Sequence, residues 1–336
     1  MTQHQKQKTD TGRRKLALGL AAGALSLPLA ARAQVVRLGS RPMTVVVPMA
    51  AGGSTDFAAR ALAQELSQAV GQAVVVENRA GATGAIGTQA VVKAAPDGNT
   101  LLVAPSSVVV FNPLVSSVPY DPVKDLTPIG LISKVETIIV ASRDSGLTSL
   151  RGLIDYAKAH PRKLNYGSNG MGSAFHLAGE LFLNMAGIEA THVPYKGASL
   201  AEVALLSNEI NWMVTNTVSA MPHIKSGRMV PLAIVSTLGK SRELPDVPDA
   251  NDTVPGYYAD TWVGLYGPAG VPKDVAARLN GMLNQYLNDE KQAAEMRRRG
   301  LEPTPGSQED LQAFQRSELA KWSKVVAALK TAGRLG

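Results

Sequence analysis

The sequence predicts an α/β fold with two lobes, and three observations support this prediction. Apolar runs of strand length alternate with segments of helical periodicity from about residue 43 onward, which is typical of α/β proteins. Two loops rich in glycine and small hydroxyl residues each join such a run to a helix. The chain of 336 residues has no cysteine, so core burial must supply its stability, and this length is sufficient for two lobes.

The first of these loops spans Pro48–Asp56. A strand predicted over Met43–Val47 precedes it, and a helix predicted over Asp56–Val70 follows it, with Ser54 or Thr55 as the expected N-cap. Its two adjacent glycines let backbone N–H groups face outward at the positive end of the helix dipole. The loop is therefore a candidate anion site, although a tight turn that needs glycine dihedrals explains the same residues.

The second loop, Asn165–Ser173, repeats this design about 120 residues later. It follows a short extended segment and leads into a helix predicted over Ala174–Ala186. Two such loops, each in its own α/β unit, predict two lobes that close on one anionic ligand. His176 lies in the first turn of this helix, where we favour a structural or loop-fixing role over proton transfer. Lys196, in a later strand-to-helix turn, is a weaker candidate for a ligand contact.

The remaining elements follow in regular alternation. In the first lobe, strands are predicted over Ala73–Glu77 and Thr100–Ala104, with a helix over Ile86–Ala94 between them. The extended segment Leu126–Ser142 is long enough to cross between lobes. A return strand is predicted over Thr261–Tyr266.

The second lobe, like the first, is expected to hold a mostly parallel sheet flanked by helices. Its predicted elements are the strands Leu164–Gly167, Ala190–Val193, Ile210–Val214 and Val230–Ser236 and the helices Ser149–Ala159, Ala174–Ala186, Leu200–Ser207 and Val218–Ser226. Three final helices should pack back on the first lobe: Lys273–Asn288, Glu290–Arg299 and Ser307–Ala332. Ser307 and Asp310 predict a capping box for the last of these. The expected limits are 34–137 with 260–336 for lobe 1 and 138–259 for lobe 2.

Residues 1–33 are predicted to be a secretory signal peptide. A basic head with Arg13 and Arg14 precedes the mostly apolar run Leu16–Leu29, and Ala31–Ala33 fits the small-residue cleavage pattern. The paired arginines leave both the general secretory (Sec) and the twin-arginine (Tat) routes open. An uncleaved membrane anchor is the alternative, although the apolar run is short for one. We expect the exported chain to begin at Gln34.

Composition excludes several function classes. The full chain has 34 Lys and Arg against 27 Asp and Glu, and removal of the leader, with six basic residues and one acidic, leaves 28 against 26. Outside the leader the only basic cluster, Arg297–Arg299, fits a helix end, so no nucleic-acid partner is expected. No nucleophile elbow, zinc-protease or P-loop motif is present. We therefore expect no catalytic residue, metal or cofactor.

Seven motifs follow one another along the chain, at Val47–Asp56, Val76–Gly84, Ala95–Gly98, Tyr120–Asp125, Asn165–Glu180, Val193–Gly197 and Pro222–Gly227. In this order they closely resemble those of the tripartite tricarboxylate transporter substrate-binding receptors, also called the Bug receptor family. The resemblance covers the chain after the leader. It implies a monomeric periplasmic receptor of the periplasmic-binding-protein (Venus-flytrap) fold, not an enzyme, that closes on a small carboxylated solute and delivers it to the subunits of a membrane permease.

The resemblance also implies the ligand contacts, which act largely through backbone N–H groups, hydroxyls and bridging water. The expected contacts are Met49, Ala51, Gly52, Gly53, Ser54, Thr55, Ser107, Asn169, Gly170, Gly172, Ser173, Ala174, Thr215, Asn216 and Trp262. The chain departs from the common pattern at Asn211 and Thr215, where aspartates are frequent. Since Thr215, Asn216 and Trp262 are neutral, we expect a mono- or dicarboxylate with a polar or flat body.

Two other functions stay open at this point. A receptor of the same fold could present its solute to a sensor protein for signalling, and sequence alone does not separate this role from uptake. An exported hydrolase or isomerase would need a positioned nucleophile, and only Ser173 with His176 offers one, without an orienting third group.

Overall fold

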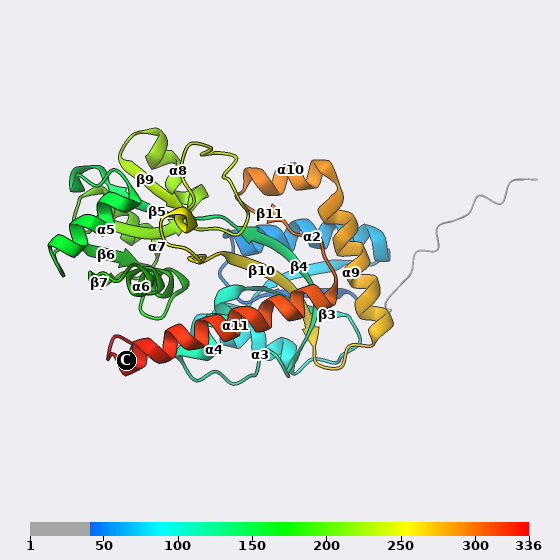
Figure 1. Ribbon diagram of the computed structural model, residues 1–336. Helices are drawn as coiled ribbons and strands as arrows, with labels where there is room; N and C mark the ends of the chain where they lie inside the picture. Colours follow the sequence, from blue (N-terminus) through cyan, green and yellow to red (C-terminus); the bar gives the residue numbers. More distant parts are fainter. Residues whose placement is uncertain (1–40, 336) are drawn as a thin grey trace, which may run out of the picture. The chain divides into compact units, whose positions relative to one another are not determined.

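The computed structural model describes residues 41–335, in which the strands form two mixed sheets flanked by helices (Figure 1). Both sheets belong to the same compact unit. The signal peptide predicted over residues 1–33 lies outside the described residues. Among the residues that are described, no helix combines the length and apolarity needed to cross a bilayer.

Lobe 1 is built on a six-stranded sheet with the order β11-β4-β10-β3-β1-β2. Its strands are β1 (Met43–Val47), β2 (Val74–Asn78), β3 (Thr100–Pro105), β4 (Leu126–Val135), β10 (Thr261–Pro268) and β11 (Glu302–Pro303). Strand β1 is parallel to β2 and β3, whereas β10 is antiparallel to β3 and β4, and β11 is antiparallel to β4. The return strand β10 therefore runs into the middle of this sheet.

The helices of lobe 1 cover both faces of that sheet, which explains the continuous apolar strands. They are α2 (Ser54–Val70), α3 (Ala85–Val92), α4 (Asn112–Val115), α9 (Lys273–Asn288), α10 (Glu290–Arg298) and α11 (Gln308–Thr331), with a π-helical turn at Ser107–Phe111. On one face Val45 packs in a cluster with Leu62 of α2 and Leu279 of α9. On the other face Val46 packs in a cluster with Val91 of α3 and Leu311 of α11.

Lobe 2 is built on a five-stranded sheet with the order β7-β6-β8-β5-β9. Its strands are β5 (Thr137–Ser142), β6 (Asn165–Ser168), β7 (Thr191–Pro194), β8 (Trp212–Asn216) and β9 (Met229–Ile234), and its helices are α5 (Leu150–Ala159), α6 (Ala174–Ala186), α7 (Ala198–Leu206) and α8 (Thr217–Lys225). Strands β6, β7, β8 and β9 run in one direction, as the prediction of a mostly parallel sheet requires, whereas β5 is antiparallel to both β8 and β9, so the sheet is mixed. Only Glu136 separates β4 from β5, so the chain enters lobe 2 at the carboxyl ends of β6 and β8, and β5 must run the other way.

The last helix packs on the first lobe, as predicted, and also reaches the second. Helix α11 packs against β4 of lobe 1 and against α6 of lobe 2. Figure 1 shows α11 running below both sheets toward α6. Its predicted capping box is confirmed, since the Ser307 side chain accepts from the Asp310 N–H and Asp310 accepts from the Ser307 N–H. The predicted helix Ala174–Ala186 is confirmed as α6.

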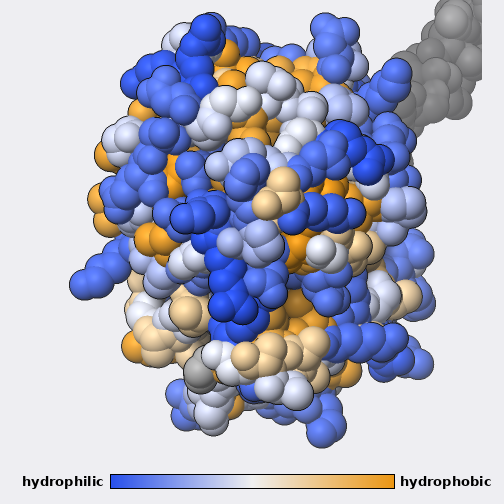
Figure 2. Space-filling model, turned by 60° about the vertical axis from the view of Figure 1, so that its left-hand side comes forward, coloured by the Kyte–Doolittle hydropathy of each residue, from blue (hydrophilic) through white to orange (hydrophobic). Residues whose placement is uncertain are grey.

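Exposed apolar residues are few and scattered. Figure 2, in which the side of lobe 2 comes forward, shows hydrophobic residues in small groups among hydrophilic ones. The largest exposed fractions are those of Val203, at 62%, and Ile86, at 56%, followed by Leu200 and Met171, at 54%. Small groups of this kind are normal on a protein surface.

Candidate functional site

The two sheets meet at the ends of the crossing strands β4, β5 and β10. The Thr217 N–H donates to the Glu136 carbonyl at 3.0 Å, and the Thr261 hydroxyl donates to Asn216 Oδ1 at 3.3 Å. The carboxyl ends of the parallel strands β1, β3, β6 and β8 lie at this junction. Ligands of open α/β sheets bind outside the carboxyl ends of strands, so the loops that follow these four strands form the candidate site.

The loop after β1 ends in an uncapped helix. The N-cap of α2 is Gly53, with φ −82° and ψ 174°, and no side chain caps it, so the prediction of Ser54 or Thr55 as the N-cap is wrong. The Phe57 N–H returns to the Gly53 carbonyl at 3.0 Å, which makes Ser54, Thr55 and Asp56 the first-turn donors. Met49 to Ser54 are exposed. A 17-residue helix therefore presents free N–H groups and its positive dipole end to solvent.

Asp56 holds this loop from behind. Its carboxylate accepts from the Gly52 N–H at 2.9 Å, from Arg60 Nε at 3.0 Å and from Asn78 Nδ2 at 2.9 Å. Burial opposes ionisation, but the hydrogen bonds from Arg60, the Gly52 N–H and Asn78 outweigh it and lower the pKa of Asp56. Asn78 also donates to the Met49 carbonyl at 3.3 Å. These hydrogen bonds fix the loop and leave the first-turn N–H groups of α2 without a side-chain partner.

The loop after β6 is arranged differently. The Ser173 hydroxyl caps α6 by accepting from the His176 N–H at 3.2 Å. The Gly172 N–H donates to His176 Nδ1 at 3.0 Å, so this donor faces the interior. Gly170 and Gly172 take φ values of 130° and 71°, which only glycine adopts readily. Ala174 follows the cap as the first residue of α6, so its N–H belongs to the orphan donors of that helix.

Two histidines and a carboxylate lie beneath the second loop. His176 stacks on His192 with 4.0 Å between ring centroids, and His192 Nε2 lies 2.7 Å from the Ser168 hydroxyl. Burial lowers the pKa of His176 to about 3 and that of His192 to about 4. Glu180 accepts from the Tyr166 hydroxyl at 2.5 Å and pairs with Arg334 at 2.9 Å. Both rings are therefore neutral at ordinary pH, and they support the loop.

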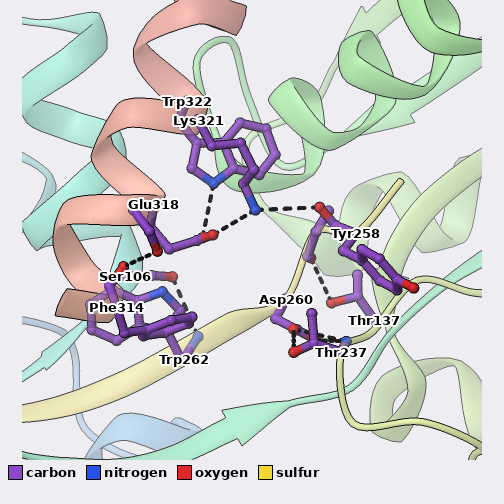
Figure 3. A network of polar contacts seen from close by, with 12 residues as sticks. Ser106, Thr137, Thr237, Tyr258, Asp260, Trp262, Phe314, Glu318, Lys321 and Trp322 are labelled. Carbon is purple, nitrogen blue, oxygen red and sulfur yellow. Dashed lines mark hydrogen bonds and ion pairs between the residues drawn. The ribbon is translucent and has the colours of Figure 1, made fainter. Parts of the chain in front are cut away.

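The remaining predicted contacts divide into two groups. Ser107 and Asn216 are only partly buried and lie at the sheet edges. Thr215 and Trp262 are 0% and 1% exposed, with the Thr215 hydroxyl 3.3 Å from Glu202 and the Trp262 ring packed on Phe314. Figure 3 shows Trp262 beside Ser106 and Phe314 in the polar network that also joins Lys321 to the Tyr258 carbonyl. The side chains of Thr215 and Trp262 thus face the interior.

Sequence reasoning missed two supporting groups. Asn78 had a signal, because it stands in the Val-Glu-Asn-Arg motif directly after a strand. The pair of Glu180 and Arg334 had none, since 154 residues separate its members.

The geometry does not favour hydrolysis. The Ser173 hydroxyl caps the helix, and Nδ1 of His176 is engaged by Gly172, so the pair lacks the contact between nucleophile and base that such chemistry requires. Within residues 41–335, no three His, Asp or Glu side chains are grouped so that they could hold a metal ion.

A two-lobed α/β fold, with the N-termini of α2 and α6 at the carboxyl ends of strands in each lobe, is typical of solute-binding receptors. Residues 58–331 match the family described as "Tripartite tricarboxylate transporter family receptor". The chain belongs to this family.

Named relatives agree with this assignment. Protein BugT of Bordetella pertussis is 35% identical over 290 residues, which cover 85% of this chain and 89% of that protein. The UPF0065 protein in the tcbD-tcbE intergenic region of Pseudomonas sp. strain P51 is 32% identical over 94% of each chain. Among solved structures, Rpa4515 of R. palustris with adipate has a TM-score of 0.74 and 35% identity, covering 88% of this chain and 98% of its own. MatC of Rhodopseudomonas palustris with bound malate has a TM-score of 0.71 and 29% identity, covering 85% and 99%.

Proposed function

We propose that this chain is an exported, non-enzymatic periplasmic receptor that binds a small mono- or dicarboxylate between its two lobes and delivers it to a tripartite tricarboxylate-type permease. The observation that carries the proposal is the exposed, uncapped N-terminus of α2 at Gly53, beside a loop that Asp56 and Asn78 hold in place. Charge-assisted hydrogen bonds from such donors contribute about 1.5 to 3 kcal/mol each to holding a carboxylate.

The second loop supplies the opposing surface. In our proposal its half-buried residues, Asn169, Gly170, Ser173 and Ala174, approach the ligand when the lobes close, while His176 accepts the Gly172 N–H on the interior side of the loop. Two structurally similar relatives were solved with dicarboxylates, adipate and malate, which supports a carboxylate as the invariant part of the ligand. The described residues place no arginine in either loop, so we propose neutral donors in its place.

The ligand can be identified from protein purified from the periplasm. If the receptor retains its solute, denaturation should release a small carboxylate that mass spectrometry can identify. Calorimetry with adipate, malate and their diamides then tests the anchor: the acids should bind, and the uncharged amides should not. Equal affinity for an acid and its amide would remove the carboxylate anchor.

The delivery step needs a separate test in cells. Uptake of the identified solute should fall when the chain is deleted and return with the wild-type chain, but not with a variant that no longer binds the solute. If uptake persists while a transcriptional response to the solute is lost, the chain serves a sensor protein instead.

A further inference from the structure

A cavity lies apart from the two glycine loops, 49–55 and 168–174, of the proposed carboxylate site. Its volume is about 930 Å³. One wall is α8 with the segment 238–243, which follows β9 of lobe 2, and the other is the end of α10 with β11 of lobe 1. No residue of the loops 49–55 or 168–174 lines it. We call this cavity the hinge pocket, because Lys134 and Glu136 of the crossing segment also contribute to it.

The charge of the hinge pocket is positive. Six lysines and arginines line it against three glutamates. Two of these acids already have partners: Glu302 accepts from Arg297 Nε at 3.2 Å, and Glu136 accepts from the Ser241 hydroxyl at 2.9 Å. Lys225 and Lys240 have no carboxylate within 4.0 Å in the part of the chain that the structure describes. The pocket therefore carries cationic charge that its own acids do not neutralise.

The wall formed by α8 adds apolar surface and an unused donor. Val218 is 44% exposed, and Met221 and Leu238 line the pocket with it. Thr217 is 5% exposed, and its hydroxyl has no hydrogen-bond partner among the described residues. A buried polar group without a partner is uncommon in native proteins and points to a missing ligand or water. It also stands at the first turn of α8, which no side chain caps.

We propose that the hinge pocket is a second binding site, for a small amphipathic organic anion that has an acidic head and an apolar body. Lys225 and Lys240 attract the head, and the apolar side chains beside them bury the body. The volume lies within the range of small-molecule sites, about 300 to 1,000 Å³. Macromolecular partners are less favoured by a cavity of this size.

Occupancy of this pocket should influence the carboxylate site. The walls belong to different lobes and already approach each other at one end, where a Cβ on Gly300 would lie 2.7 Å from the Val218 Cβ. A ligand that contacts both walls stabilises the arrangement in which they have this spacing. The coupling between the two sites is reciprocal.

The probe for the test is 4-phenylbutyrate, with its uncharged amide as the chemical control. Calorimetry on the full exported chain should show saturable binding of the acid and none of the amide. The double variant Lys225→Glu with Lys240→Glu should weaken this binding at least tenfold. Lys324→Glu is the matched control, since it reverses an exposed lysine on α11 outside the pocket, and it should leave binding unchanged.

Val218→Trp provides an independent variant, because it fills the pocket from an exposed position and should also abolish binding. Binding that survives both the charge reversals and Val218→Trp would overturn the proposal, as would the absence of saturable binding. If Gly53→Val weakens binding of 4-phenylbutyrate as strongly as binding of adipate, the probe binds at the glycine loops and the proposal also fails. The inference holds whether or not the carboxylate site takes the ligand proposed above.

The source of the anion is decided by native mass spectrometry with adipate. Two adipates on the wild-type chain and one on the double variant would identify a second copy of the solute as the occupant. One adipate on both, with 4-phenylbutyrate still binding only to wild type, would identify a chemically distinct anion. Either result supports the site, whereas identical 4-phenylbutyrate binding by both proteins contradicts it.

Discussion

His176 Nδ1 accepts a hydrogen bond from the Gly172 backbone N–H at 3.0 Å, so a side chain of α6 holds the loop that precedes this helix. An imidazole that accepts at Nδ1 and is neutral carries its proton on Nε2. That nitrogen lies 3.9 Å from Glu180 Oε1, and Glu180 in turn pairs with Arg334. The second loop is thus anchored from the interior of lobe 2 and, through Arg334, to the end of the chain.

Replacing His176 should destabilise this loop, and more so when the new side chain has no hydrogen-bond acceptor for the Gly172 N–H. His176→Leu leaves the buried Gly172 N–H without a partner, which should cost about 1 to 3 kcal/mol in the free energy of unfolding. His176→Asn keeps an acceptor near the position of Nδ1 and should recover part of that loss. Urea unfolding measures stability, and calorimetry with the bound carboxylate should follow the same order. Equal losses for the two variants would show that the hydrogen bond is unimportant.

Acid should destabilise the folded chain because two histidines are kept neutral. The pKa of His176 is about 3 and that of His192 about 4, against an ordinary value of 6.5. Between pH 6.5 and these values the unfolded chain binds more protons, so the free energy of unfolding falls as the pH falls. His176 alone should account for about 2 kcal/mol between pH 8 and pH 5.

The other charged and titratable groups around the two rings set the control for this measurement. Burial raises the pKa of Glu180, and Tyr166 and Arg334 act against that rise. A raised carboxyl pKa stabilises the folded chain at low pH, which opposes the effect of the histidines. Urea unfolding at pH 5 and pH 8 should therefore show a smaller difference for His176→Asn than for wild type. An unchanged difference would mean that His176 does not titrate with folding.

Removing Arg334 should lower the free energy of unfolding, because it leaves the buried carboxylate of Glu180 without its cationic partner. The side chain of Glu180 is 1% exposed and that of Arg334 is 38% exposed. Loss of a buried ion-pair partner costs about 3 to 5 kcal/mol, and the exposure of Arg334 reduces our expectation to about 1 to 3 kcal/mol for Arg334→Ala. In a Glu180→Gln background, Arg334→Ala should lower the free energy of unfolding much less than it does in the wild-type chain. A double-mutant cycle by urea unfolding measures this coupling, and strict additivity of the two changes would contradict it.

Local chemistry made much of the fold predictable. Strand β1 was recognisable because its three valines are buried between two layers of helices. The bounds of α6 were predictable because Ser173 caps its start and Gly187, with φ 63°, ends it. The two-residue strand β11, Glu302–Pro303, carries no such signal, since its pairing with β4 is decided by tertiary packing.

Side-chain direction at the sheet edges was harder to predict. Thr215 stands at the carboxyl end of β8, where a ligand contact is reasonable, yet its hydroxyl turns toward Glu202 and Ser219. Residues along a strand alternate between the two faces, and the preceding Val214 lies in the cluster on the opposite face with Trp212. The order of elements in the sequence predicts which residues lie at the carboxyl ends of the strands. The direction of each side chain depends on the strand register, which is known only from the assembled sheet.

The two glycine loops differ in how they tolerate a side chain, and this difference selects the best test of the carboxylate site. Gly53 has φ −82°, and a Cβ built on it meets no atom within 4 Å. Gly172 has φ 71°, and its Cβ would lie 3.0 Å from Val115 Cγ2. A substitution at Gly172 therefore strains the backbone and crowds α4, so lost binding there would be ambiguous.

Gly53→Val should leave the free energy of unfolding within about 1 kcal/mol of wild type, since the position is extended, open and precedes the helix. The valine side chain stands at the N-cap, where it should obstruct the free N–H groups of α2. The affinity for every carboxylate should therefore fall at least tenfold. Gly53→Ala should have a smaller effect in the same direction. Calorimetry with adipate and malate, together with urea unfolding of the same preparations, measures both quantities. Undiminished carboxylate affinity in a stable Gly53→Val protein would move the anchor away from α2.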